Sequence, residues 1–129
     1  MKKYDNFCRA LDNLKEIYDY DKPYSNVTRS GLVALFNICF EQSWKAMKEI
    51  LENQGYAKEQ VYSPKMVIRT AYQAGMVDDE LLWLDALNAR NNVTHVYNSA
   101  VAEAIIDETK NGFVAMFADL KNNIEKNWL

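Results

Sequence analysis

The chain has 129 residues, of which 49% are hydrophobic and 26% charged, and its net charge is −3. A chain of this size and balance can bury about two-thirds of its unfolded surface, so it needs neither a disulfide nor a metal to fold. Its overall acidity argues against a protein that grips nucleic acid over a broad basic face. We expect one domain over residues 1–129, with no DNA among its partners.

No segment of the sequence is typical of export or membrane insertion. The charged N-terminus is followed by no apolar stretch of the signal-peptide kind, and the densest apolar run, 31–40, is too short to span a bilayer. Cys8 and Cys39 fall within apolar helical patterns and lack the spacing of metal ligands, so we expect two reduced core residues. These features predict a cytoplasmic protein with no membrane partner.

The apolar spacing in the first half of the chain predicts two helices. A helix over about 5–20 is indicated by apolar residues at steps of three and four, namely Phe7, Leu11, Leu14 and Tyr18. A turn-forming segment follows, and a second, long helix is predicted over 27–54, with Gly55 just past its end. Its wide apolar stripe is typical of the central helix of a bundle.

The second half predicts three more helices. Ser63-Pro64 is a helix start, because serine caps the first turn and proline suits its first position, and that helix stops at Gly75. Acidic caps at 78–80 begin a fourth helix, which runs through Leu81, Leu84 and Leu87 to about His95. Asn98-Ser99 breaks the chain before a fifth helix over 100–127. The fold class predicted is all-α, an antiparallel up-and-down bundle of about five helices.

Several kinds of chemistry are disfavoured by the composition. The chain has no glycine-rich phosphate loop, and one histidine with two scattered cysteines cannot form a zinc site. We therefore expect no cofactor and no metal. Asp78 and Asp79 form an adjacent pair that is more typical of helix caps than of catalytic carboxylates. Trp44 and Trp83 lie on apolar stripes and are expected in the core.

One motif carries candidate chemistry: Arg90-Asn91-x3-His95-x-Tyr97, which contains the only histidine of the chain. Asn91 and His95 are four residues apart and share a helix face. Arg90 and His95 are roughly 140° apart around a straight helix, so they converge only if the helix loosens or the arginine bends across. Spacing alone leaves two interpretations open: a functional site, or a surface charge beside a capping or core histidine.

Three longer segments accompany this motif in order: Phe40-Glu41-Gln42-Ser43-Trp44-Lys45, the stretch 63–79, and Trp83 to Asn91. Together with Arg90-x4-His95-x-Tyr97 they resemble the nucleotidyltransferase substrate-binding protein family, a branch of the HEPN superfamily. The resemblance covers 40–97. It implies a homodimer in which Arg90 and His95 of both subunits line a cleft. It also implies a separately encoded minimal nucleotidyltransferase as partner, in a prokaryotic toxin–antitoxin-like pair, and Tyr97 as the residue that such a partner modifies with a nucleotide.

Two functions remain open, of which the first below is the predicted one and the second is the alternative. In a metal-independent endoribonuclease, the toxin of the pair, His95 of one subunit would act as base and that of the other as acid on RNA. Arg90, supported by Asn91, would then stabilise the charge on the phosphorane. In a non-catalytic binding subunit, Arg90 and Asn91 would instead hold a phosphate or a partner loop, which suits the acidic chain better. Glu41, on the long helix, either braces Arg90 or faces water.

Overall fold

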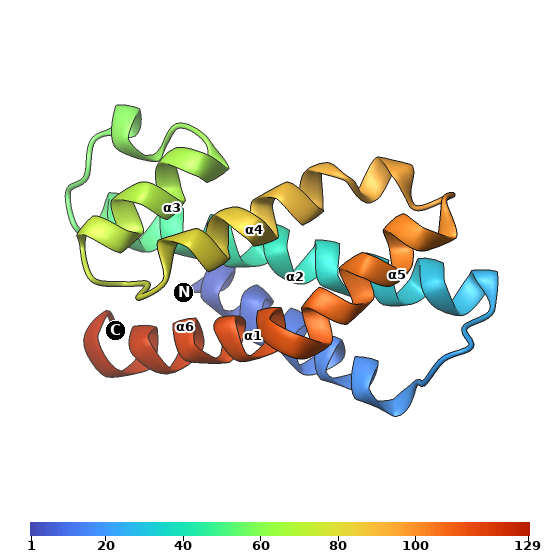
Figure 1. The fold of residues 1–129 in the computed structure, drawn as a ribbon. Coiled ribbons are helices and arrows are strands. Elements are labelled where there is room, and N and C mark those ends of the chain that lie inside the picture. Colours follow the sequence, from blue (N-terminus) through green and yellow to red (C-terminus); the bar gives the residue numbers. More distant parts are fainter.

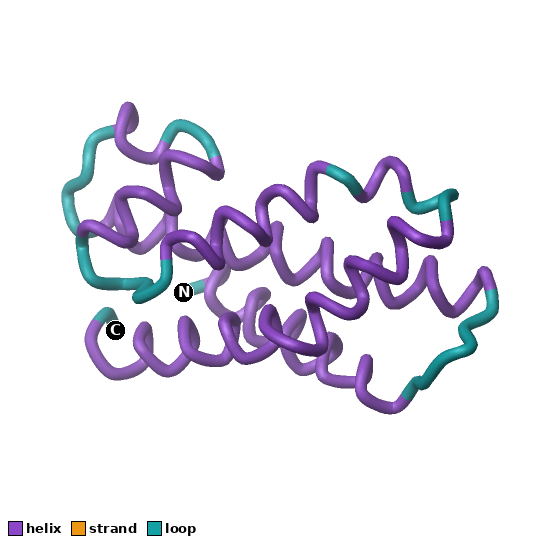
Figure 2. The backbone as a smooth tube through the Cα atoms, viewed as in Figure 1, coloured by secondary structure: helices purple, strands orange, loops and turns teal.

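The computed structural model describes all residues 1–129, and the chain folds into helices only (Figures 1 and 2). The α-helices are α1 (Lys2–Leu14), α2 (Asn26–Asn53), α3 (Pro64–Gln73), α4 (Glu80–Asn91), α5 (Ser99–Glu108) and α6 (Val114–Asn127). Three short 3₁₀ turns are η1 (Lys15–Asp19), η2 (Lys58–Val61) and η3 (Val93–His95). A π turn, η4 (Thr109–Phe113), joins α5 to α6 in one rod. The predicted helical bundle is confirmed.

The four long segments alternate in direction: α1, α2, α4 and the α5–α6 rod (Figure 1). Helix α3 is the exception, since it lies at one end of the bundle beside α2 and α4. Short connections between neighbouring helices produce this arrangement. One consequence concerns α4, whose first turn lies at the α3 end of the bundle and whose last turn lies near the start of α5.

The predicted helix starts are confirmed by their caps. The Ser63 hydroxyl accepts from the Met66 N–H, and Pro64 occupies the first helical position. The Asp79 carboxylate accepts from the Leu82 N–H, and the Asn98 side chain accepts from two N–H groups of the first turn of α5. Each side chain satisfies a donor that the helix itself cannot pair.

One detail of the predicted helix faces is wrong. Tyr18, expected on the apolar face of the first helix, is 51% exposed, because α1 tightens into a 3₁₀ turn from Lys15 onward. Its hydroxyl donates to the backbone carbonyl of Lys110 at 2.9 Å. The fourth helix includes Leu81, as predicted, and this side chain is 74% exposed in its first turn.

An aromatic cluster holds the helices together. Phe36 on α2 stacks on Phe113 at a centroid distance of 5.4 Å. The indole of Trp83 on α4 meets Phe117 on α6 edge-on at 5.5 Å and lies 6.3 Å from Phe40. Such contacts add to the large area that aromatic side chains bury. Trp83 is therefore the core anchor of α4, as predicted.

The two cysteines are free thiols, Cys39 buried and Cys8 half-buried. Burial raises the pKa of the Cys39 thiol far above its usual range, which keeps this side chain protonated and unreactive. None of the helices combines the length and the apolar character needed to cross a membrane.

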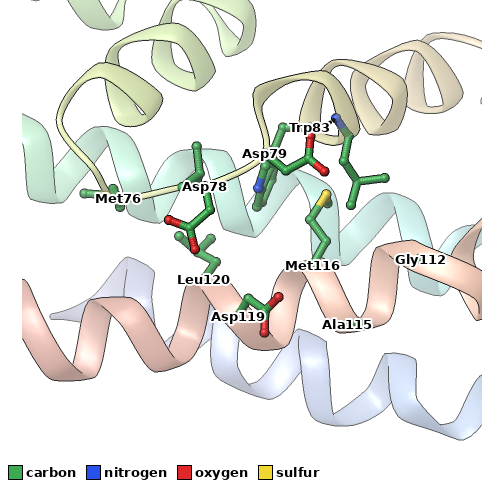
Figure 3. A pocket seen from close by; sticks show the side chains of 11 residues that line it. Met76, Asp78, Asp79, Trp83, Gly112, Ala115, Met116, Asp119 and Leu120 are labelled. Carbon is green, nitrogen blue, oxygen red and sulfur yellow. Dashed lines mark hydrogen bonds between the residues drawn. The ribbon is translucent and has the colours of Figure 1, made fainter.

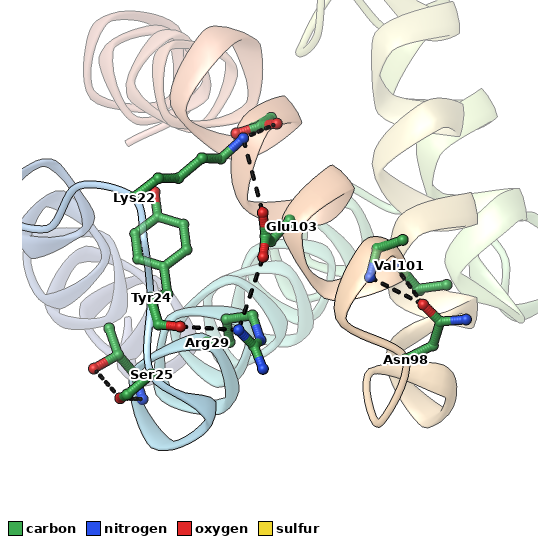
Figure 4. A network of polar contacts seen from close by, with 10 residues as sticks. Lys22, Tyr24, Ser25, Arg29, Asn98, Val101 and Glu103 are labelled. Carbon is green, nitrogen blue, oxygen red and sulfur yellow. Dashed lines mark hydrogen bonds and ion pairs between the residues drawn. The ribbon is translucent and has the colours of Figure 1, made fainter.

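A polar network fastens the loop before α2 to α5 (Figure 4). Lys22 Nζ donates to the Asp107 carboxylate at 3.0 Å. Arg29 Nη1 donates to the Tyr24 carbonyl at 2.9 Å and lies 3.8 Å from the Glu103 carboxylate. These contacts hold the loop before α2, and the first turns of α2, against α5.

Candidate functional site

Arg90, in the last turn of α4, is paired with Glu41 on α2. Its Nε donates to Glu41 Oε2 at 2.7 Å and its Nη2 donates to Oε1 at 3.3 Å. The indole N–H of Trp44 donates to the same Oε1 at 3.1 Å. The two charged side chains are 31% and 24% exposed, so water screens the pair only in part. A two-pronged contact of this kind fixes the plane of the guanidinium.

The Glu41–Arg90 contact shows where two side chains of α2, Glu41 and Trp44, lie. Glu41 braces Arg90 and does not face open water. Trp44 was expected in the core but is only half-buried, because its indole N–H needs the Glu41 carboxylate as a partner. Asn91 completes the group from α4, since its side-chain oxygen accepts from Arg90 Nη1 at 3.2 Å.

Beyond Arg90 the helix loosens. The N–H of His95 bonds to the carbonyl of Asn92 at 2.9 Å, a 3₁₀ contact in place of the α-helical one. The His95 side chain is exposed, and Tyr97 is 84% exposed. Their rings meet edge-on at a centroid distance of 6.1 Å, and the Tyr97 hydroxyl lies 3.5 Å from His95 Nδ1. At that distance the hydrogen bond is weak, so both side chains present polar atoms to solvent.

His95 also lines a shallow hollow of about 310 Å³ between α4 and α5. Its polar lining residues are Asn88, Asn92, His95 and Glu108. Although the Glu108 side chain is exposed, its surroundings remove part of its water, and this desolvation, followed by the nearby charge of Asp85, raises the pKa of its carboxyl. Arg90 is absent from the lining of this hollow.

The structure therefore does not bring Arg90 and His95 together within one chain. The helix loosens, as convergence would require, but Arg90 reaches toward α2 while His95 faces the hollow beside α5. No hydrogen bond joins the two side chains. In a single chain the motif forms two adjoining groups: Arg90 with Glu41, Trp44 and Asn91, and His95 with Tyr97.

Comparison with known proteins identifies the family of the chain. The family model described as "Nucleotidyltransferase substrate binding protein like" matches residues 2–126, nearly the whole chain. The chain belongs to this nucleotidyltransferase substrate-binding-protein-like family. No curated protein matches it significantly.

Two solved structures share the fold of this family member. A Thermus thermophilus protein is 29% identical, with a TM-score of 0.78, and the match covers 92% of this chain and 98% of that one. HI0074 from Haemophilus influenzae is 19% identical, with a TM-score of 0.80 and coverage of 95% and 98%. The HI0074 structure is described as revealing the fold of a substrate-binding domain of a nucleotidyltransferase.

The hollow beside His95 in this member of the substrate-binding-protein-like family was not predicted from the sequence. Asn88, Asn92 and His95 follow one another at steps of four and three, which places them on one helix face. That spacing was available in the sequence. The contribution of Glu108 was not, because it comes from α5 and depends on how α5 packs against α4.

Proposed function

We propose that this protein is a non-catalytic binding subunit that acts with a separately encoded minimal nucleotidyltransferase in the cytoplasm of a prokaryote. Family membership supports the partner. The two-pronged Glu41–Arg90 contact carries the non-catalytic part of the proposal. Phosphate cleavage needs a base and a cation at the same phosphate. In one chain the cation is already neutralised by Glu41, and the histidine faces a different hollow.

The exposed turn that follows α4, residues 93–98, is the proposed contact surface for the nucleotidyltransferase. Tyr97 presents an aromatic ring that is 84% exposed, with the exposed His95 beside it. Large aromatic side chains of this kind commonly provide the binding energy at protein interfaces. The Tyr97 hydroxyl is open to a transferase. A nucleotide attached there would put negative charge beside His95 and alter that surface.

The test is co-purification of the nucleotidyltransferase encoded beside this chain, with affinities measured for wild type and two matched variants. Tyr97→Ala should weaken binding at least about tenfold, the usual effect of losing a central aromatic contact. Tyr62→Ala is the control, because Tyr62 is 82% exposed but stands two residues before α3, the helix at the other end of the bundle. Equal affinity for both variants would reject the proposed surface. Mass spectrometry of the co-expressed protein tests modification of Tyr97.

The second candidate is a metal-independent endoribonuclease formed by a homodimer, the toxin of a toxin–antitoxin pair. The observation in its favour is that His95 is exposed and only weakly held by Tyr97, so its ring is available to a second subunit. One His95 would take the proton of the RNA 2′-hydroxyl and the other would protonate the departing 5′-oxygen. Arg90 would leave Glu41 to meet the phosphate.

Mixed dimers distinguish this candidate from the first. Because the step uses His95 of both subunits, an equal mixture of wild-type and His95→Ala chains should cleave at well below half of the wild-type rate, since every mixed dimer lacks either the base or the acid. His95→Ala alone should not cleave. A binding subunit predicts no cleavage in any of the three samples.

A further inference from the structure

A second hollow lies at the opposite end of α4, between the start of that helix and the α5–α6 rod (Figure 3). Its volume is about 280 Å³. Its apolar part is formed by Leu82, Trp83, Met116 and Leu120, and its acidic part by Asp78, Asp79 and Asp119. Nothing in the proposed function uses these residues.

The carboxylates of this hollow have no cationic partner. Asp79 is engaged as the cap of α4, where its Oδ1 accepts from the Leu82 N–H at 3.0 Å. Asp78 and Asp119 take part in none of the salt bridges of the chain, which lie elsewhere. No lysine or arginine lines the hollow. Carboxylates gathered on apolar walls create a negative potential that attracts a cation.

An independent observation comes from Trp83, which is 2% exposed and lines the same hollow. Its indole N–H donates to no protein atom. Three side-chain atoms of the chain are fully enclosed and unpaired: Tyr4 Oη, Gln42 Oε1 and Glu49 Oε1. The Trp83 nitrogen is unpaired but is not one of them, so it keeps some access to solvent. Figure 3 shows the ring among the side chains that surround the hollow. Buried polar groups are normally paired, and this donor is left for an acceptor that the chain does not supply.

The walls of the hollow are fixed in place. Asn123 on α6 donates through Nδ2 to the carbonyls of Gly75 and Met76, at 2.9 and 2.6 Å, and so holds the loop that carries Asp78. Gly112, in the π turn, lines the hollow without a side chain. A Cβ there would lie 3.7 Å from Leu82 Cδ1, so a longer side chain would enter the space. Turns of this type are frequent at functional sites.

We propose that this hollow binds a small organic cation, in which a guanidinium or ammonium group on a short apolar stem is joined to a carbonyl or hydroxyl acceptor. Asp78 and Asp119 would hold the cation, Met116 and Leu82 would contact the stem, and the Trp83 N–H would donate to the acceptor. An anion would be repelled. The side chains are not grouped as metal ligands, which favours an organic cation over a metal ion.

An adjoining polar hollow shares Asp78 and Asp119 with the first. It also contains Lys126, which would oppose a second positive charge. The cation is therefore assigned to the hollow beside Trp83. The proposal does not depend on the nucleotidyltransferase partnership, because it uses neither Arg90, His95 nor Tyr97.

The test is a titration of the full chain with N-acetyl-L-arginine amide, followed by ¹H–¹⁵N NMR of the three tryptophan indole groups. Trp83→Phe identifies the Trp83 signal, and Trp44 and Trp128 serve as internal controls. We expect the Trp83 signal to move saturably while the other two stay in place. N-acetyl-L-citrulline amide, a neutral analogue of nearly the same shape, should leave all three signals unmoved.

Two matched double variants test the carboxylates. Asp78→Asn/Asp119→Asn should weaken binding of the arginine compound at least tenfold. Asp12→Asn/Asp19→Asn removes the same charge from exposed positions that do not line the hollow, and should leave the affinity within twofold. The proposal is overturned if the Trp83 signal fails to move, if citrulline moves it equally, or if the two double variants lose affinity alike.

Discussion

The two ends of α4 differ in charge and in how the charge is satisfied. At the C-terminal end, Arg90 is held by the Glu41 carboxylate in two hydrogen bonds. At the N-terminal end, Asp78 and Asp119 face a hollow that is lined by no lysine or arginine. One end of α4 thus carries a charge that the fold has already paired. The hollow at its other end is lined by carboxylates, from the preceding loop and from α6, that have no cationic partner.

This difference bears on function. A paired arginine has a fixed orientation. It is better suited to holding the local structure in place than to moving toward a phosphate. Unpaired carboxylates beside a free indole N–H are available to a ligand. Partner binding is therefore proposed for one end of α4 and small-molecule binding for the other, and the variants below test the structural basis of each.

The largest effect is expected at Trp83, which anchors the acidic end of α4 in the core. Trp83→Ala should lower the free energy of unfolding by about 3–5 kcal/mol, because it leaves a cavity beside Phe40 and Phe117. Trp128→Ala, near the C-terminus, should cost far less. Urea unfolding measures both. A cost for Trp83→Ala no larger than that for Trp128→Ala would show that α4 is not anchored here.

At the other end, Glu41→Ala should cost about 1–2 kcal/mol, between the values for exposed and fully buried ion pairs. Combining Glu41→Ala with Arg90→Ala should cost less than the sum of the single changes, since both remove the same contact. The control is Asp12→Ala, whose exposed pair with Lys15 is 4.0 Å long. Urea unfolding measures all four variants. If the loss in the free energy of unfolding of the double variant equalled the sum of the two single losses, Glu41 and Arg90 would not be coupled.

The loop that carries Asp78 depends on Asn123. Asn123→Ala removes two hydrogen bonds to backbone carbonyls and should lower the free energy of unfolding by about 1 kcal/mol. It should also speed amide exchange in 75–79. Asn122→Ala is the matched control, because the exposed Asn122 side chain makes no hydrogen bond with the protein. Equal exchange rates in the two variants would contradict a loop held by Asn123.

The smallest effect is expected from Glu108, in the hollow beside His95. Its raised pKa means that the folded chain holds this proton more tightly than the unfolded chain does, so stability falls as pH rises from the ordinary value of about 4.5 through the raised one. Glu108→Gln should remove that fall and stabilise the protein at pH 7 by less than about 0.5 kcal/mol, since the side chain is exposed. Thermal unfolding at pH 4 and pH 7 is the measurement. If the variant and wild type lost stability equally between pH 4 and pH 7, Glu108 would not be the source of that fall.

Most of the fold could be predicted because its signals are local. A cap such as Ser63 or Asp79 is recognised from the residues that follow it, and apolar periodicity gives the length of α2. The π turn at 109–113 could not be predicted, since its residues form an unbroken helical pattern and the wide turn depends on packing. Tyr18 fits the apolar period of the first helix, but it lies at the helix end, where the core no longer covers it.

The candidate site was only half predictable. The motif around Arg90 and His95 stays a prediction of the functional segment, and the structure shows that the helix loosens before His95. The pairing of Arg90 with Glu41 joins residues 49 positions apart, so no local spacing indicates it. The acidic hollow was missed for the same reason: Asp78 was interpreted as a cap, and Asp119 reaches it only through the packing of α6.

Above all, we infer that the chain binds and does not cleave. The decisive experiment is incubation of the purified, unmodified protein with labelled RNA in EDTA, beside Arg90→Ala and His95→Ala and with the oligomeric state checked in each sample. We predict that wild type leaves the RNA as intact as both variants do. Cleavage by wild type that is lost in both variants would contradict this inference and establish the metal-independent ribonuclease instead.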